Sequence, residues 1–179
     1  VIGTAKLQDR VKSLPGCIFI DEDNVCSGLT FACIRDLISK RYPKAVRRTG
    51  WYFQQFIKLA YSYQCKNRYY LTWDSDTILT KDLSLFNKSD RPYMDYLPSV
   101  KYDKGYFELL DKISIDKVIF SKKQSDSFIT EHMLFDCNIV KNMLEAIESN
   151  DVLPGKYFFE KIINAIPLHN LNLSGFSEF

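Results

Sequence analysis

One segment of the chain reads Tyr69-Tyr70-Leu71-Thr72-Trp73-Asp74-Ser75-Asp76-Thr77. Its first five residues are aromatic, aliphatic or β-branched, and this composition predicts a buried strand over residues 68–73. Two aspartates with one serine between them follow where that strand should end. In open α/β sheets, ligands bind beyond the carboxyl ends of the strands. We therefore expect the two carboxylates to lie at a binding site.

The paired aspartates favour metal-dependent chemistry on a diphosphate. Carboxylate oxygens suit a hard divalent cation such as Mn²⁺ or Mg²⁺, and the cation can in turn hold phosphate oxygens. This combination favours a glycosyltransferase that uses a nucleotide-sugar donor. The alternative interpretation is structural, with Asp74 and Asp76 capping a solvated turn.

Composition indicates one globular domain that spans residues 1–179. Hydrophobic residues make up 46% of the chain, enough for a sizeable core. The net charge of +2 is too small to indicate a nucleic-acid partner. No apolar run approaches the roughly 20 residues of a transmembrane helix, and no secretory signal is visible. The five cysteines include no C-x-x-C pair, which suggests reduced thiols, no zinc site and a cytoplasmic protein.

Hydrophobic periodicity predicts a mixed α/β domain, with a mixed sheet flanked by helices. Further strands or extended runs are expected at residues 17–20, 117–120, 127–130 and 133–135. Helices are expected at residues 30–41, 50–64, 103–111, 138–148 and 156–166. Thr49 and Asn138 are the expected N-caps of the second and fourth helices, and Pro43 and Pro167 should stop the first and the last.

Three segments carry a resemblance to a known family. They read Gly50-Trp51-Tyr52-Phe53-Gln54-Gln55-Phe56-Ile57-Lys58-Leu59, Tyr70-Leu71-Thr72-Trp73-Asp74-Ser75-Asp76-Thr77-Ile78-Leu79 and Ser127-Phe128-Ile129-Thr130-Glu131-His132-Met133-Leu134-Phe135. In this order and spacing they resemble a family of mostly bacterial GT-A-type glycosyltransferases that is associated with surface-polysaccharide and lipo-oligosaccharide synthesis. The terminal Gly175-Phe176-Ser177-Glu178-Phe179 is similar to the start of that family's S-E-[YF]-E segment.

The resemblance implies a GT-A-like, Rossmann-related domain. Members of the family begin upstream of the position of Val1 and continue past the Ser-Glu motif, so we expect this chain to be trimmed at both ends. It also implies a nucleotide-diphosphate sugar as donor and a glycan or lipid-linked saccharide as acceptor. We expect no nucleic-acid partner and no transmembrane segment, with peripheral contact to the inner face of the membrane.

Roles for the donor side follow from the resemblance. Asp76 should bind the metal directly, while Asp74 should contact the ribose, or the metal through water. Gln54 and Gln55 suit hydroxyl or base recognition, and Lys58 suits phosphate oxygens. Gln54 and Lys58, at positions i and i+4, should share the cleft of Asp76. A structural role on a solvated helix face is the alternative for these three residues, and Trp51 is either a donor contact or a core residue.

On the acceptor side, an inverting transferase needs a carboxylate that takes the proton of the attacking hydroxyl. Glu131 and Glu178 are the two candidates for this base. His132 is a candidate ligand for metal, phosphate or acceptor, and a structural histidine is the alternative.

Two other classes of protein fit part of the pattern. Strand-Asp74-Ser75-Asp76-Thr77 also matches the D-x-D-x-[TV] signature of haloacid-dehalogenase-like phosphatases, whose first aspartate is a nucleophile. Residues 118–121 resemble their second motif, but no D-D or G-D-x-x-x-D element follows Ser121. The second alternative is a non-catalytic fragment that binds a nucleotide sugar.

Overall fold

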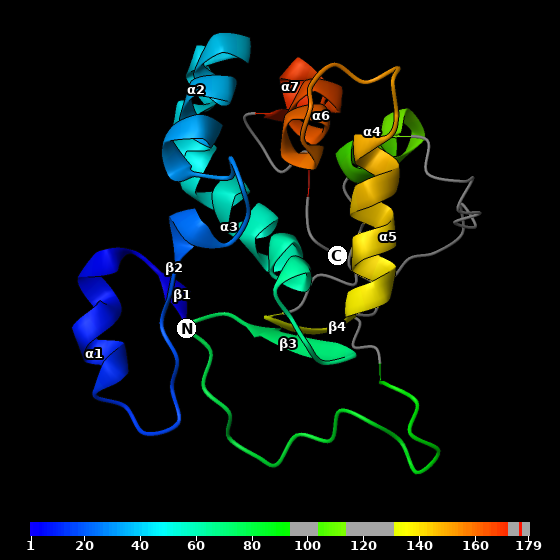
Figure 1. The fold of residues 1–179 in the computed structure, drawn as a ribbon. Helices are drawn as coiled ribbons and strands as arrows, with labels where there is room; N and C mark the ends of the chain where they lie inside the picture. Colours follow the sequence, from blue (N-terminus) through cyan, green and yellow to red (C-terminus); the bar gives the residue numbers. More distant parts are fainter. Residues whose placement is uncertain (94–103, 114–130, 172–175, 177–179) are drawn as a thin grey trace.

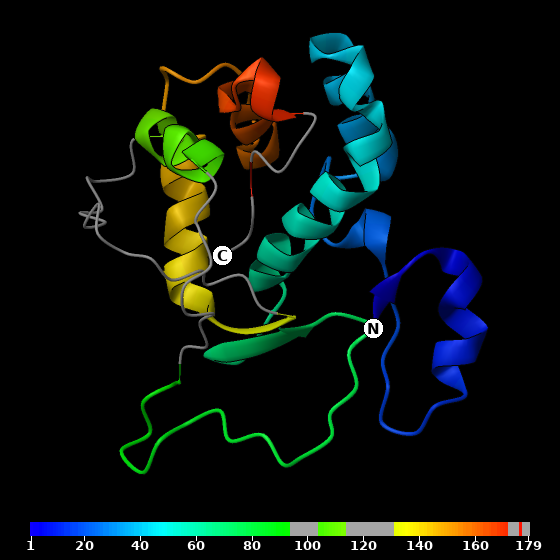
Figure 2. The ribbon, with the colours of Figure 1, turned by 180° about the vertical axis from the view of Figure 1, so that it is seen from behind.

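The computed structural model describes residues 1–93, 104–113 and 131–171 together with Phe176 (Figures 1 and 2). Its strands are β1 (Ile2–Gly3), β2 (Ile20–Asp21), β3 (Tyr69–Trp73) and β4 (His132–Asp136). Its α-helices are α1 (Gln8–Lys12), α2 (Phe31–Arg41), α3 (Thr49–Ala60), α4 (Lys104–Ile113), α5 (Cys137–Glu148), α6 (Phe158–Ala165) and α7 (Leu168–Leu171). Short 3₁₀ segments cover Ala5–Leu7, Glu22–Asn24, Pro43–Arg48 and Tyr61–Tyr63.

The predicted mixture of helices and strands is confirmed, but the described strands do not form one sheet. β1 and β2 pair in parallel, with Ile2 opposite Ile20 and Gly3 opposite Asp21. β3 and β4 form a separate antiparallel pair, in register from Tyr69 opposite Asp136 to Trp73 opposite His132. The described part of the chain is therefore a set of helices with two small sheets.

The strand predicted at residues 17–20 is mostly wrong. Only Ile20 and the following Asp21 pair with β1, whereas Ile18 is 76% exposed. A short apolar run forms a strand only if the fold buries it, and Ile18 remains exposed to solvent. The strand predicted at 68–73 and the extended run at 133–135 are confirmed as β3 and β4. The runs predicted at 117–120 and 127–130 lie outside the described residues.

The five predicted helices are all present, although two of their predicted caps are wrong. Thr49 does not cap α3: its Oγ1 donates to the Val46 carbonyl at 2.7 Å, because the chain enters α3 directly from a 3₁₀ segment. Asn138 does not cap α5 either. Asp136 is the cap, and its Oδ1 accepts from the N–H groups of Asn138 and Ile139 at 2.9 and 3.3 Å.

The capping role of Asp136 is reflected in the pKa of its carboxyl group. Burial alone would raise the pKa of this carboxyl, but its hydrogen bonds from the α5 backbone and from Arg68 hold the pKa below its ordinary value. A carboxylate at the start of a helix is also favoured by the helix dipole. The residue that ends β4 is thus the residue that starts α5.

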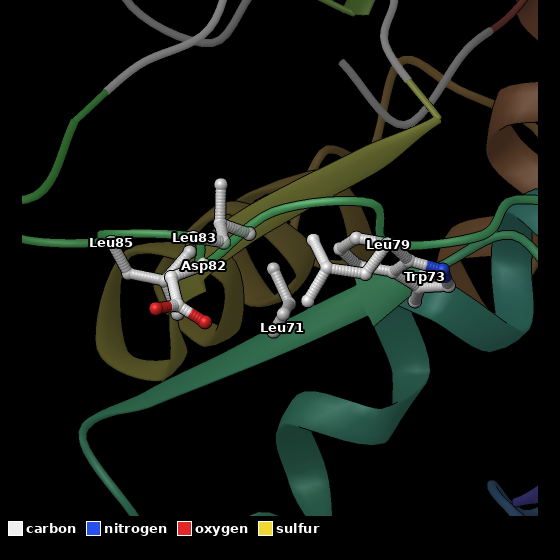
Figure 3. A pocket seen from close by; sticks show the side chains of 6 residues that line it. All are labelled: Leu71, Trp73, Leu79, Asp82, Leu83 and Leu85. Atoms are coloured by element: carbon white, nitrogen blue, oxygen red, sulfur yellow. The ribbon is translucent and has the colours of Figure 1, made fainter.

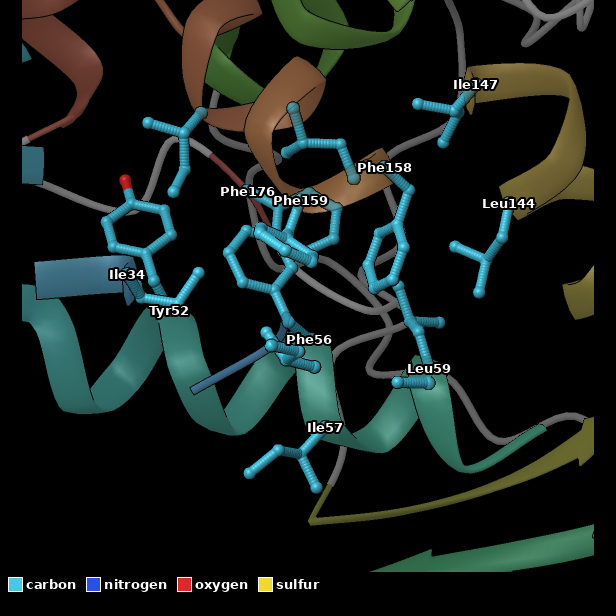
Figure 4. Close-up of a cluster of buried hydrophobic side chains, with 14 of the residues drawn as sticks. Ile34, Tyr52, Phe56, Ile57, Leu59, Leu144, Ile147, Phe158, Phe159 and Phe176 are labelled. Carbon is cyan, nitrogen blue, oxygen red and sulfur yellow. The ribbon is translucent and has the colours of Figure 1, made fainter. Parts of the chain in front are cut away.

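Helix α3 lies at the centre of the hydrophobic core (Figure 4). The ring of Phe56 is fully buried, and its centroid lies 5.9, 6.3 and 5.4 Å from those of Phe158, Phe159 and Phe176. One turn earlier, the buried Tyr52 donates its hydroxyl to the carbonyl of Leu171 at 3.0 Å. These contacts fix α3 against α6 and the C-terminal part of the chain.

The β3–β4 sheet has one face against the core and one face outside. Tyr70 and Phe135 lie opposite each other on the inner face, and their rings stack at 5.2 Å. Residues alternate between faces along a strand, so Tyr69, Leu71 and Trp73 lie on the outer face. The loop that follows β3 runs along this outer side (Figures 1 and 2).

A buried lysine joins α5 to α6. Lys161 is 3% exposed, and its Nζ donates to the carbonyls of Glu148 and Asn150 at 2.6 and 2.7 Å. Both carbonyls lie at the C-terminal end of α5, where backbone acceptors lack partners within the helix. The cation also matches the negative end of the helix dipole. Lys161 is therefore a capping residue supplied by the neighbouring helix.

We predict that Lys161→Met lowers the free energy of unfolding by about 2–3 kcal/mol, because it leaves two partly buried carbonyls without their charged donor. Lys12→Met, which replaces an exposed lysine of α1, should change it by less than about 0.5 kcal/mol. Urea denaturation followed by circular dichroism measures both variants. Equal effects of the two substitutions would contradict the capping role.

Candidate functional site

The end of β3 meets the start of β4 at the aspartate motif. The backbone N–H of Asp74 donates to the carbonyl of Glu131 at 2.9 Å. This bond continues the ladder one residue beyond the Trp73–His132 pair. Asp74 and Glu131, which are 57 positions apart in the sequence, therefore lie directly opposite each other. In a regular ladder, residues opposite each other point to the same face, so we expect the two carboxylates, one position beyond the strands, on one side of the sheet.

Lys58 reaches this same side from the last turn of α3. Its Nζ lies 2.8 Å from Oδ1 of Asp74, and the two side chains are 13% and 30% exposed. Water screens such a partly buried ion pair less than a surface pair. The structure thus brings together Lys58, Asp74 and Glu131, from three separate segments of the chain.

Tyr70 holds α3 over the sheet at this point. Its hydroxyl donates to the carbonyl of Lys58 at 2.9 Å, and burial raises the pKa of Tyr70, so the hydroxyl stays a neutral donor. Sequence reasoning did not identify Tyr70 as part of the site. The signal was present, because Tyr70 and Asp74 are four residues apart on one strand and so lie on the same face.

Asp76 has a different environment from Asp74. The Thr77 N–H donates to the Asp74 carbonyl at 3.0 Å and closes a tight turn, and Trp73 Nε1 donates to the Thr77 carbonyl at 2.9 Å. Asp76 sits within this turn, and its side chain is exposed. The two carboxylates of the motif are therefore unequal: Asp74 is paired with Lys58, while Asp76 faces solvent.

The outer face of the sheet carries an open pocket of about 550 Å³ (Figure 3). It lies between β3 and the loop after the motif, and it is lined by Leu71, Trp73, Leu79, Asp82, Leu83 and Leu85. The rings of Trp73 and His132 pack against each other with centroids 5.0 Å apart. His132 therefore lies on the face opposite to Lys58, next to the wall of this pocket.

The other helix candidates lie farther from the aspartates. Gln54 is exposed one turn before Lys58, and Gln55 is buried. Trp51 is half-buried, and the guanidinium of Arg48 lies 4.5 Å from its ring centroid. Seven residues separate Trp51 from Lys58, which is about 10 Å along the helix. Among the α3 candidates, Lys58 is the one with a contact to the aspartate motif in the described structure.

A metal at this site would need ligands from outside the protein as well. Within residues 1–93, 104–113 and 131–171, no cluster of three His, Cys, Asp or Glu side chains could hold an ion alone. Mg²⁺ commonly takes only one or two carboxylates and completes its shell with substrate phosphates and water. The Asp74–Asp76 pair fits that donor set. Glu178, the second candidate base, lies outside the described residues.

In the parts that the structure describes, every helix is too short or too polar to span a bilayer. All five cysteines are free thiols.

The comparisons with known proteins give one match. The model of a family of unknown function (DUF6492) matches residues 5–90, a segment that includes α2, α3, β3 and the aspartate motif. No curated protein and no solved structure matches the chain. The matched segment contains Lys58, Asp74 and Asp76, and it ends before Glu131.

We predict that Lys58 and Asp74 stabilise the fold jointly by about 1 kcal/mol, because their contact is partly buried. A double-mutant cycle with Lys58→Met and Asp74→Asn, measured by urea denaturation, gives this coupling energy. The exposed Lys40–Asp36 pair of α2 is the control, since its side chains are 73% and 57% exposed, and we expect at most about 0.5 kcal/mol there. A coupling near zero for Lys58 and Asp74 would show that the contact contributes nothing in solution.

Proposed function

We propose that the chain is a metal-dependent glycosyltransferase of GT-A-like, Rossmann-related fold. It would move a sugar from a nucleotide-diphosphate donor to a hydroxyl of a glycan or lipid-linked saccharide. The observation that carries the proposal is the meeting of Lys58, Asp74 and Glu131 at the end of β3. The sequence and its resemblance imply a phosphate contact for Lys58, a donor contact for Asp74 and a base for Glu131. Their proximity supports one common site.

The donor side uses the two unequal carboxylates and the lysine. Asp76 and Asp74 would hold Mn²⁺ or Mg²⁺, and the bound cation supplies neutralisation of the charge that develops on the diphosphate. Lys58 is held 2.8 Å from Asp74 on a well-anchored helix turn. Its ammonium can donate to phosphate oxygens without a large change of position. Gln54, exposed on the preceding turn, remains the candidate for hydroxyl contacts.

The acceptor side uses Glu131. Its side chain is exposed, while its backbone is held by Asp74. As base, its carboxylate takes the proton of the acceptor hydroxyl; the oxygen forms the new bond to the anomeric carbon, and the bond from that carbon to the diphosphate breaks. Glu178 is the second candidate for this role.

The cell compartment is part of the same proposal. Nucleotide-sugar chemistry and five reduced thiols are both consistent with the cytoplasm, next to the inner face of the membrane. A non-catalytic module that binds a nucleotide sugar would use the same donor residues. The catalytic base, Glu131 or Glu178, is what distinguishes it from the enzyme.

We predict that one nucleoside-diphosphate sugar raises the melting temperature of the chain only when Mn²⁺ or Mg²⁺ is present.

Asp76→Asn should weaken the binding of that nucleoside-diphosphate sugar roughly 100-fold, about 2.7 kcal/mol, because it removes a charged metal ligand. Asp90→Asn is the matched control: Asp90 is an exposed carboxylate in the same loop, and asparagine accepts its left-handed backbone, with a φ of 55°. Calorimetry that finds equal affinities for both variants with metal present would rule out the metal role of Asp76.

We predict that Glu131→Gln lowers the transfer rate by about 10²- to 10⁴-fold and leaves donor affinity unchanged, because the base acts on the acceptor. Glu145→Gln removes an exposed carboxylate of α5 and should change neither quantity. Product formation is measured with the nucleoside-diphosphate sugar that stabilises the chain and with a panel of saccharide acceptors. A Glu131→Gln protein that transfers at the wild-type rate would move the assignment to Glu178, and donor binding without any transfer would favour the non-catalytic module.

A further inference from the structure

A strongly basic segment lies between the end of α2 and the start of α3. Residues 35–48 contain six cationic side chains and one carboxylate, Asp36, a net charge of +5. The cationic residues are Arg35, Lys40, Arg41, Lys44, Arg47 and Arg48. The whole chain carries +2, so the rest of it carries −3, the difference between the two values. The excess positive charge of this protein is therefore concentrated in residues 35–48.

The fold places this segment at the end of α2 and α3 that lies away from the β3–β4 sheet (Figure 1). Arg41 and Arg48 are partly buried and contact other parts of the fold. Arg41 donates to the carbonyl of Ile166 at 2.6 Å, and Arg48 lies over the ring of Trp51. The other four side chains are exposed: Arg35, Lys40, Lys44 and Arg47, of which Lys40 pairs with Asp36 on α2. We call these four residues the basic end.

The segment that Arg41 contacts carries an exposed apolar side chain. Leu168, the first residue of α7, is 49% exposed and follows two residues after Ile166, which Arg41 binds. Cationic side chains beside exposed apolar ones are typical of surfaces that lie at a membrane interface. A surface for single-stranded nucleic acid would instead need an open aromatic face for base stacking. Trp51, the tryptophan of this region, already carries Arg48 on its ring.

We propose that the basic end binds the head groups of an anionic phospholipid bilayer. Four exposed cations at one end of a helix pair match the negative surface of such a bilayer, and clusters of this size are sufficient for lipid attraction. The rest of the chain, with its net negative charge, would be repelled from the same surface, so attraction and repulsion together orient the protein. The proposal does not depend on sugar transfer, because nine residues, about 14 Å of α3, separate Thr49 from Lys58.

The experiment compares two triple variants of the 179-residue chain in vesicle co-sedimentation. The test variant carries Arg35→Gln, Lys40→Gln and Lys44→Gln. The control carries Lys66→Gln, Lys81→Gln and Lys88→Gln, three exposed lysines of the sheet end. Each variant lowers the net charge from +2 to −1, so only the position of the lost charges differs. The vesicles are either mixed phosphatidylglycerol and phosphatidylcholine or phosphatidylcholine alone, at about 0.1 M salt, where the Debye length is about 10 Å.

We expect the unchanged chain to bind the anionic vesicles, and to release them when the salt is raised. The test variant should lose on the order of 100-fold in partition coefficient, whereas the control should lose much less. Circular dichroism confirms that both variants are folded. Failure of the unchanged chain to bind anionic vesicles overturns the proposal, as does an equal loss in both variants. Tighter binding to a single-stranded oligonucleotide than to anionic vesicles at the same salt would assign the basic end to nucleic acid instead.

Discussion

The packing of α3 is the constraint on which the other elements depend. Phe56 is fully buried among Phe158, Phe159 and Phe176, and it faces segments that are about 100 residues or more away in sequence. Each buried aromatic ring removes roughly 150–250 Å² of surface from water, so this cluster is a large part of the apolar burial. Because α3 is buried on most of its sides, its position determines where both of its ends lie. Its C-terminal end carries Lys58 to the sheet, and its N-terminal end carries the basic segment to the surface.

Packing between helix and sheet then sets the geometry of the site. The buried Tyr70 hydroxyl holds the carbonyl of Lys58, and the same inner face of β3 carries Asp74. An unpaired Tyr70 hydroxyl or Lys58 carbonyl at this depth would be costly, which keeps the helix end in place. The Lys58 ammonium is therefore near Asp74 before any ligand arrives. Such preorganisation is what a phosphate-binding lysine requires.

Local patterns in the sequence predicted the elements well and their pairing less well. The spacing of Val140, Met143, Leu144 and Ile147 predicts the inner face of α5. Three of the four are buried, and Met143 is partly buried and packs against the core. The aromatic run before Asp74 predicts β3 for the same reason, since both signals lie within one element. The antiparallel pairing of β3 with β4 could not be read from either strand. It depends on how α3, α5 and α6 close the core between them.

For the candidate site too, the sequence predicts which residues take part but not which of them contact each other. The D-x-D pattern identifies both aspartates, but the sequence does not distinguish a carboxylate that faces a helix from one on an open turn. Lys58 contacts Asp74 rather than Asp76 because Asp74 directly follows the end of β3, whereas Asp76 lies in the exposed turn after it. Thr49 illustrates the limit for caps, because a threonine before an apolar run is a cap only if the preceding backbone is extended. Here a 3₁₀ segment precedes it.

The charges of the site give a physical reason for the proposed need for a metal. Lys58, Asp74, Asp76 and Glu131 carry one positive and three negative charges, a net charge of −2, when all four are ionised. A nucleoside diphosphate alone would meet net repulsion there, despite the ammonium of Lys58. A divalent cation on the exposed Asp76 would cancel the excess, so donor and cation should bind together more tightly than either does alone. In the proposed enzyme, Asp76, the exposed carboxylate of the D-x-D motif, is thus the residue that makes donor binding depend on metal.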